Sequence, residues 1–125
     1  MENIDVSVVD ITKKFGDFTA VDNVTLDVPR GSFFSILGPS GSGKTTLLRM
    51  IAGFEQPTIG DIYIAGERVN DLPPNKRRSN LVFQNLALFP MMNVARNIGF
   101  GLRRRGVRKS EIAERVNRIL EKIVL

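Results

Sequence analysis

The chain has 125 residues, the size of one modest domain, and its 42% hydrophobic and 25% charged residues are typical of a soluble globular protein. Cysteine and histidine are both absent, which excludes disulfides and thiolate metal sites and argues against a transition-metal site. The formal net charge of +5 comes largely from two basic clusters, residues 76–78 and 103–109, which fit either a solvated face or a surface for nucleic acid or anionic lipid.

The start of the chain predicts two strands. Val6, Val8 and Ile11 indicate the first, and the alternation of apolar and polar residues over 24–28 indicates a second strand that is buried on one face. Residues 1–5 include acids and no apolar run of signal-peptide type, so we expect a cytoplasmic chain. No apolar stretch approaches the roughly 20 residues of a membrane-spanning helix.

The middle of the chain predicts a strand followed directly by a helix. Residues 32–37 are almost continuously apolar, as in a strand that is covered on both faces of a parallel sheet. The helix begins at Lys44, and Gly53 is placed to end it in a left-handed conformation. Ile62 and Ile64 then alternate with polar neighbours, which indicates a further, hairpin-like strand.

The last third of the chain predicts one more strand and two helices. Residues 81–83 indicate a buried strand that ends at Gln84, and residues 93–102 are weakly helical because two glycines interrupt them. Ser110 is expected to cap the final helix, with Glu111 favoured in its first turn by the helix dipole. The apolar stripe of this helix comprises Ile112, Val116, Ile119 and Ile123.

The sequence Gly-Pro-Ser-Gly-Ser-Gly-Lys-Thr at residues 38–45 matches a phosphate-binding loop, and it lies between a predicted strand and a predicted helix. Its glycines allow successive backbone N–H groups to face phosphates, and the helix start adds partial positive charge. We expect Lys44 to reach the β and γ phosphates, Thr45 to ligate Mg²⁺ and Thr46 to contact the α phosphate.

Three passages, residues 11–16, 38–55 and 81–90, resemble the nucleotide-binding subunit of ABC transporters, particularly importers of the spermidine/putrescine, iron and sugar type. The resemblance implies an α/β P-loop NTPase fold of the ABC ATPase type. Residues 1–125 would form the N-terminal part of a single nucleotide-binding domain. Within it, residues 1–84 would form the β subdomain with the Walker A strand, loop and helix, and residues 85–125 would start the helical subdomain.

The resemblance also assigns roles to single residues. Phe15 would stack on adenine, since stacking needs only a flat aromatic face, although it could instead be a core or loop aromatic. Gln84 would contact Mg²⁺ or the attacking water, whereas an isolated glutamine is otherwise usually structural. The residues expected to hold ATP and Mg²⁺ are therefore Phe15, Gly38, Pro39, Ser40, Gly41, Ser42, Gly43, Lys44, Thr45 and Thr46, with Thr45 and Gln84 at the metal.

The partners implied by the resemblance are transmembrane permease subunits, a second nucleotide-binding subunit and, indirectly, a solute-binding protein. The complex would place the chain at the cytoplasmic face of the inner membrane, as a peripheral subunit, and no nucleic acid is expected. Met91, Met92 and the basic run from Arg103 would lie on the helical subdomain that docks onto the permease. The methionines could equally fill a core.

Three motifs that complete the hydrolytic site of the family are absent from the 125 residues: the Leu-Ser-Gly-Gly-Gln signature, an apolar strand ending in Asp-Glu, and a later histidine. These groups position water and Mg²⁺, so we expect ATP binding rather than hydrolysis. We hypothesise a truncated product. The alternatives are a nucleotide-binding remnant with no transport role and a soluble ABC ATPase that acts on nucleic acid.

Overall fold

A computed structural model describes residues 3–123 of the chain. They fall into two compact units, one ending at Leu81 and the other beginning at Val82, which are described separately below. Within the described residues, every helix is too short or too polar to cross a membrane.

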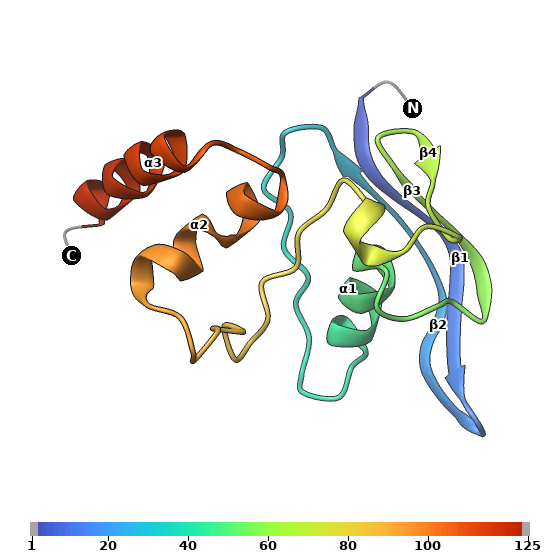
Figure 1. Ribbon diagram of the computed structural model, residues 1–125. Helices are drawn as coiled ribbons and strands as arrows, with labels where there is room; N and C mark the ends of the chain where they lie inside the picture. The colour runs from blue at the N-terminus through green and yellow to red at the C-terminus, as the bar shows by residue number, and fades with distance from the viewer. Residues whose placement is uncertain (1–2, 124–125) are drawn as a thin grey trace. The chain divides into compact units, whose positions relative to one another are not determined.

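The first unit is built on a sheet of four strands in the order β2-β1-β3-β4, with antiparallel pairing throughout (Figure 1). Its strands are β1 (Ile4–Phe15), β2 (Phe18–Pro29), β3 (Ile59–Ile64) and β4 (Glu67–Arg68). Val8 on the central strand β1 pairs with Leu26 on one side and Ile62 on the other. The two strands predicted near the N-terminus and the hairpin-like strand around Ile62 are thereby confirmed.

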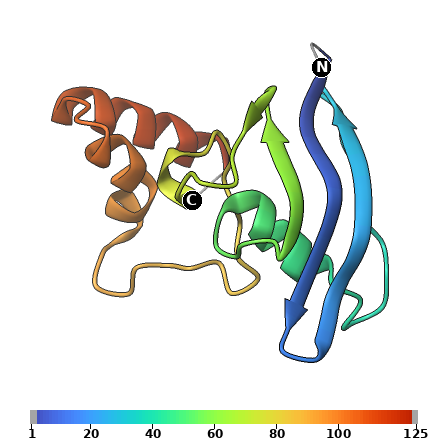
Figure 2. The same ribbon diagram turned by 90° about the vertical axis from the view of Figure 1, so that its right-hand side faces the viewer.

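The core of this unit lies between the sheet and α1 (Lys44–Ala52), which covers one sheet face (Figure 2). Val8, Ile11 and Ile62 from the strands pack with Leu47 and Met50 from the helix. The helix ends, as predicted, at Gly53, whose φ of 97° only glycine adopts without strain. A short 3-10 helix, η1 (Pro74–Lys76), follows the β4 hairpin.

The two predicted buried strands, over residues 32–37 and 81–83, are wrong. Residues 32–39 have no regular structure, and Phe33 and Leu37 are 97% and 92% exposed. Residues 81–83 are likewise outside any strand, and Val82 is 81% exposed. An apolar run becomes a central strand only when neighbouring strands complete its hydrogen-bond ladder, and within residues 3–123 the sheet contains only β1 to β4.

The second unit contains α2 (Val94–Arg104) and α3 (Lys109–Lys122). The predicted helix over 93–102 is confirmed, with Asn93 as its N-cap accepting a hydrogen bond from the Arg96 N–H. The two helices meet closely at Gly99, where a Cβ atom would lie 2.9 Å from Ile112 Cγ2. The loop before α2 is fixed by Asn97, whose amide nitrogen donates to the carbonyls of Phe89, Met92 and Asn93.

The start of α3 differs from the prediction. Its N-cap is Arg108, with no side-chain capping bond, and Ser110 is already the second helical residue. Glu111 does lie in the first turn, as expected. Of the predicted apolar stripe, Val116 is buried and Ile112 half-buried, whereas Ile119 and Ile123 are exposed.

Candidate functional site

The loop at residues 38–43 requires glycine at its last position. Gly41 and Gly43 have φ values of 82° and 90°, in the left-handed region that favours glycine. A Cβ atom on Gly43 would lie 2.3 Å from the carbonyl oxygen of Ala20 on β2. The loop and the strand can therefore lie this close together only because residue 43 has no side chain. The glycine pattern seen in the sequence therefore has a steric cause in the structure.

Lys44 turns back across the loop that precedes it. Its Nζ donates to the carbonyl oxygen of Gly38, to that of Pro39 at 2.7 Å and to Ser42 Oγ at 3.0 Å. The Ser42 N–H also donates to the Pro39 carbonyl at 3.2 Å, which closes a turn inside the loop. The ammonium group is thus held against the loop by three acceptors and places positive charge there.

The N-terminus of α1 presents backbone donors at the same place. Gly43 is its N-cap, no side chain caps it and its first turn contains no acidic residue. The first N–H groups of a helix have no intrahelical acceptor and carry the positive end of the helix dipole. Lys44, Thr45 and Thr46 are the first three helical residues. These groups fit a polyphosphate: an ammonium, free N–H donors and a hydroxyl suited to Mg²⁺.

Phe15 ends β1 and is 45% exposed, so it is not a core residue. Lys13 Nζ lies over its ring, 5.0 Å from the ring centroid. An exposed aromatic face in the unit that carries the loop has the chemistry needed to stack on a base. The stacking role stays a prediction.

Gln84 lies in an exposed turn of the second unit, outside any strand, so the prediction that it ends a buried strand is wrong. Thr45 belongs to the first unit, and a Mg²⁺ site shared by the two residues stays a prediction. Among the described residues there is no group of three or more carboxylates that could hold a metal ion.

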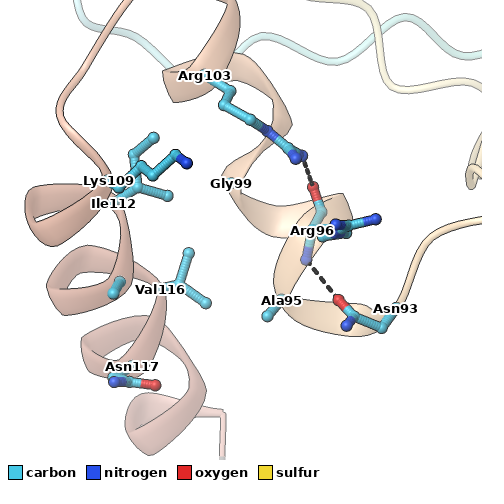
Figure 3. Close-up of a pocket in the computed structure, with 10 residues that line it drawn as sticks. Asn93, Ala95, Arg96, Gly99, Arg103, Lys109, Ile112, Val116 and Asn117 are labelled. Atoms are coloured by element: carbon cyan, nitrogen blue, oxygen red, sulfur yellow. Dashed lines mark hydrogen bonds between the residues drawn. The ribbon is translucent and has the colours of Figure 1, made fainter.

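A separate cavity of about 330 Å³ lies between α2 and α3 in the second unit (Figure 3). Its lining includes the apolar residues Gly99, Ile112 and Val116 and the cationic residues Arg96 and Lys109. It therefore differs in chemistry from the loop at residues 38–46, where backbone N–H groups accompany the charge.

Two side chains that sequence reasoning missed support α1 and Phe15. Arg77 belongs to a basic cluster that fitted a solvated face, yet it is 6% exposed and donates to the Met50 and Ile51 carbonyls at the end of α1. Lys13 bonds to residues that follow α1. These contacts with α1 and the segment after it have no local sequence signal, because Met50, Ile51 and Gln56 are 26 to 43 residues away from Arg77 or Lys13 along the chain.

Comparison with known proteins identifies relatives along most of the chain. The family model described as ABC transporter matches residues 21–125. The spermidine/putrescine import ATP-binding protein PotA of Rubrobacter xylanophilus is 57% identical over 111 residues, 89% of this chain and 29% of that protein. The protein of the same name in Thermotoga maritima is 51% identical over 119 residues, 95% of this chain and 32% of that protein. The chain thus spans about a third of the length of the curated relatives it matches.

Solved structures agree with the sequence comparison. A dimeric ATP-binding cassette in a post-hydrolysis state bound to ADP and Pi has a TM-score of 0.79 and 33% identity, over 93% of this chain and 56% of that chain. A dimeric bacterial ABC transporter cassette has a TM-score of 0.77 and 37% identity, over 93% of this chain and 54% of that one. The predicted P-loop NTPase fold of the ABC ATPase type is confirmed, and the chain belongs to the ABC transporter ATP-binding family.

Proposed function

We propose that residues 38–46 bind the phosphates of MgATP. The observation that carries this proposal is the convergence of Lys44 Nζ, the uncapped N-terminus of α1 and a glycine-lined loop on one side of the first unit. Lys44 supplies a positive charge, the N–H groups bind phosphate oxygens, and the Thr45 hydroxyl supplies a hard oxygen ligand for Mg²⁺. Phe15 supplies the aromatic face for adenine, and Gln84 contacts the metal or water.

We further propose that the chain acts within the energy-coupling subunit of an ABC import complex. The named relatives are spermidine/putrescine import ATP-binding proteins, which supports an import role and a polyamine as the solute. Permease subunits and a second nucleotide-binding subunit are the proposed partners, at the cytoplasmic face of the inner membrane. Binding rather than hydrolysis is the activity proposed for these 125 residues, because the sequence contains no signature motif, no Asp-Glu strand end and no histidine.

Calorimetry with MgATP tests the binding site. We compare the unaltered chain with Lys44→Ala and with a matched control, Lys76→Ala, which removes an exposed lysine from η1 of the same unit. A bond from a charged donor contributes about 1.5–3 kcal/mol, so Lys44→Ala should weaken MgATP binding by roughly 10- to 100-fold. Lys76→Ala should leave the affinity unchanged.

Thermal unfolding supplies an independent measurement. A folded site gains about 2.7 kcal/mol when MgATP is present at 100 times its dissociation constant, whereas a chain without the site gains nothing. Equal affinities of the Lys44→Ala variant and the unaltered chain, or an unfolding temperature that MgATP does not raise, would contradict the proposal.

A further inference from the structure

Lys13 joins the Phe15 ring to the segment that follows α1. Its Nζ lies 5.0 Å from the ring centroid, within the range of a cation–π interaction. The same atom donates to the Gln56 carbonyl at 2.7 Å and lies 3.3 Å from Glu55 Oε2. The Lys13 side chain is only 14% exposed. One ammonium group therefore contacts a ring, a carbonyl oxygen and a carboxylate at once.

The position of Phe15 makes this contact consequential. Phe15 is the last residue of β1 and pairs with Phe18, the first residue of β2, at the tip of a hairpin. Hairpin tips are the least restrained part of a sheet, because strand pairing continues in one direction only. A cation over one ring face limits the rotation of the ring, while 45% of the residue remains exposed.

The other anchors of Lys13 lead to the helix that carries Lys44. Glu55 and Gln56 follow α1 closely, and the Glu55 N–H donates to the Arg49 carbonyl within that helix at 3.3 Å. The hairpin tip is attached to the same segment a second time, by the Lys14 N–H donating to Thr58 Oγ1 at 2.9 Å. Lys13 therefore contacts both the aromatic ring and the segment that directly follows the phosphate-binding helix.

We propose that Lys13 is a positioning residue for the nucleotide base, holding the Phe15 ring in the orientation in which its open face stacks on adenine. The inference rests on the proposed function, because it requires MgATP at residues 38–46 and the base at Phe15. Lys13 itself touches neither phosphate nor base. Its effect comes from ordering the ring before binding, which removes an entropy cost that the nucleotide would otherwise have to overcome.

The experiment separates the base from the phosphates by using two ligands, ATP and inorganic tripolyphosphate, each with Mg²⁺ and each titrated calorimetrically. Lys13→Met removes the charge and keeps the aliphatic stem. Lys14→Met is the matched control, since it makes the same change at the neighbouring exposed lysine. Lys13→Arg keeps a cation over the ring and tests rescue.

We expect Lys13→Met to weaken ATP binding by about three- to tenfold and to leave tripolyphosphate binding within about twofold, because only ATP has a base to stack. Lys14→Met and Lys13→Arg should retain ATP affinity within about twofold. Phe15→Ala should weaken ATP binding by about tenfold, and adding Lys13→Met to it should cause no further loss, since the two changes act through one ring.

Three results would overturn the inference: Lys13→Met with unchanged ATP affinity, equal losses for ATP and tripolyphosphate, or additive losses in the double variant. Each of these is distinct from failure of the proposed function, in which the unaltered chain binds neither ligand. A further outcome is that the unaltered chain binds tripolyphosphate and that Phe15→Ala leaves the ATP affinity unchanged. This outcome would support the phosphate site but contradict both the base site at Phe15 and the role of Lys13.

Discussion

Replacing Arg77 should destabilise the first unit strongly, because its buried guanidinium donates to four backbone carbonyls. Nε donates to the Leu72 carbonyl at 2.9 Å, and one terminal nitrogen donates to those of Met50 at 2.8 Å and Ile51 at 3.1 Å. The other terminal nitrogen donates to the Asn70 carbonyl at 3.5 Å. Gly53 allows this approach, since a Cβ atom there would lie 2.7 Å from Nε. Arg77 thus serves as a C-terminal cap of α1 that is supplied from outside the helix.

The size of the effect follows from opposing contributions. A bond to a charged donor contributes about 1.5–3 kcal/mol, and a cation at a helix C-terminus adds up to about 2 kcal/mol when partly buried. Burial of the charge opposes these contributions, and it lowers the pKa of the Arg77 guanidinium below its ordinary value. Arg77→Met leaves buried backbone carbonyls without a donor, at a cost of about 1–3 kcal/mol for each group that stays unsatisfied, so we expect a net loss of about 3 kcal/mol.

The assay is thermal unfolding of the chain followed by circular dichroism. A loss of 3 kcal/mol corresponds to a fall in Tm of roughly 12–24 °C for a unit of this size. Arg78→Met is the matched control, because Arg78 is exposed, and it should change the stability by less than about 0.5 kcal/mol. Arg77→Lys should lie between the two, since an ammonium cannot reproduce the planar fork of donors.

An Arg77→Met variant as stable as Arg78→Met would refute the reasoning. In that case the cost of burying the charge would equal or exceed the contribution of its bonds, as in proteins whose buried ion pairs can be replaced by apolar residues without loss. Arg77 would then make no net contribution to the free energy of unfolding, and α1 would be held in place by the packing of Leu47 and Met50 against the sheet.

Three further substitutions test the local geometry. Gly43→Ala should cost about 3 kcal/mol or more in urea unfolding, because a strained φ is joined by a clash with the Ala20 carbonyl, whereas Gly41→Ala has open space and should cost only about 1–2 kcal/mol. Similar losses for the two would exclude the clash. Asn93→Ala should remove about 1 kcal/mol of helix stability and speed hydrogen exchange at the Arg96 amide; an unchanged exchange rate would contradict the cap.

Local patterns predicted the elements whose partners are close in sequence. The alternation over residues 24–28 identified β2 because β1 and β2 form a hairpin in which neighbouring segments pair directly. Gly53 ended α1 as expected because a left-handed C-terminus depends on one residue and its own helix. The strand predicted over residues 32–37 is wrong because it depended on distant partners. An apolar run cannot reveal whether strands are present on both of its edges.

The candidate site also has features that the sequence predicts and features that it does not. The spacing of glycines before Lys44 predicted the loop, since it fixes both the backbone conformation and the place of the ammonium group. The contacts that support α1 and Phe15 could not be predicted, because Arg77 and Lys13 bond to carbonyl oxygens, which every residue possesses and which carry no sequence signature. Only the tertiary structure could select these two cations from the 18 lysines and arginines of the chain.

The contacts of Lys44 also limit how large its contribution to nucleotide affinity can be. Its ammonium bonds to the carbonyl oxygens of Gly38 and Pro39 and to Ser42 Oγ, so a phosphate oxygen gains it only by replacing some of these partners. The contribution of Lys44 is therefore the difference between bonds to a charged phosphate oxygen and bonds to neutral acceptors, so the loss expected for Lys44→Ala lies toward the lower end of the roughly 10- to 100-fold range. Because the side chain is already ordered, little rotamer entropy is lost when the acceptor changes. The contacts within the loop therefore reduce the net free energy of the lysine–phosphate bond, but they also hold the cation in position before the ligand binds.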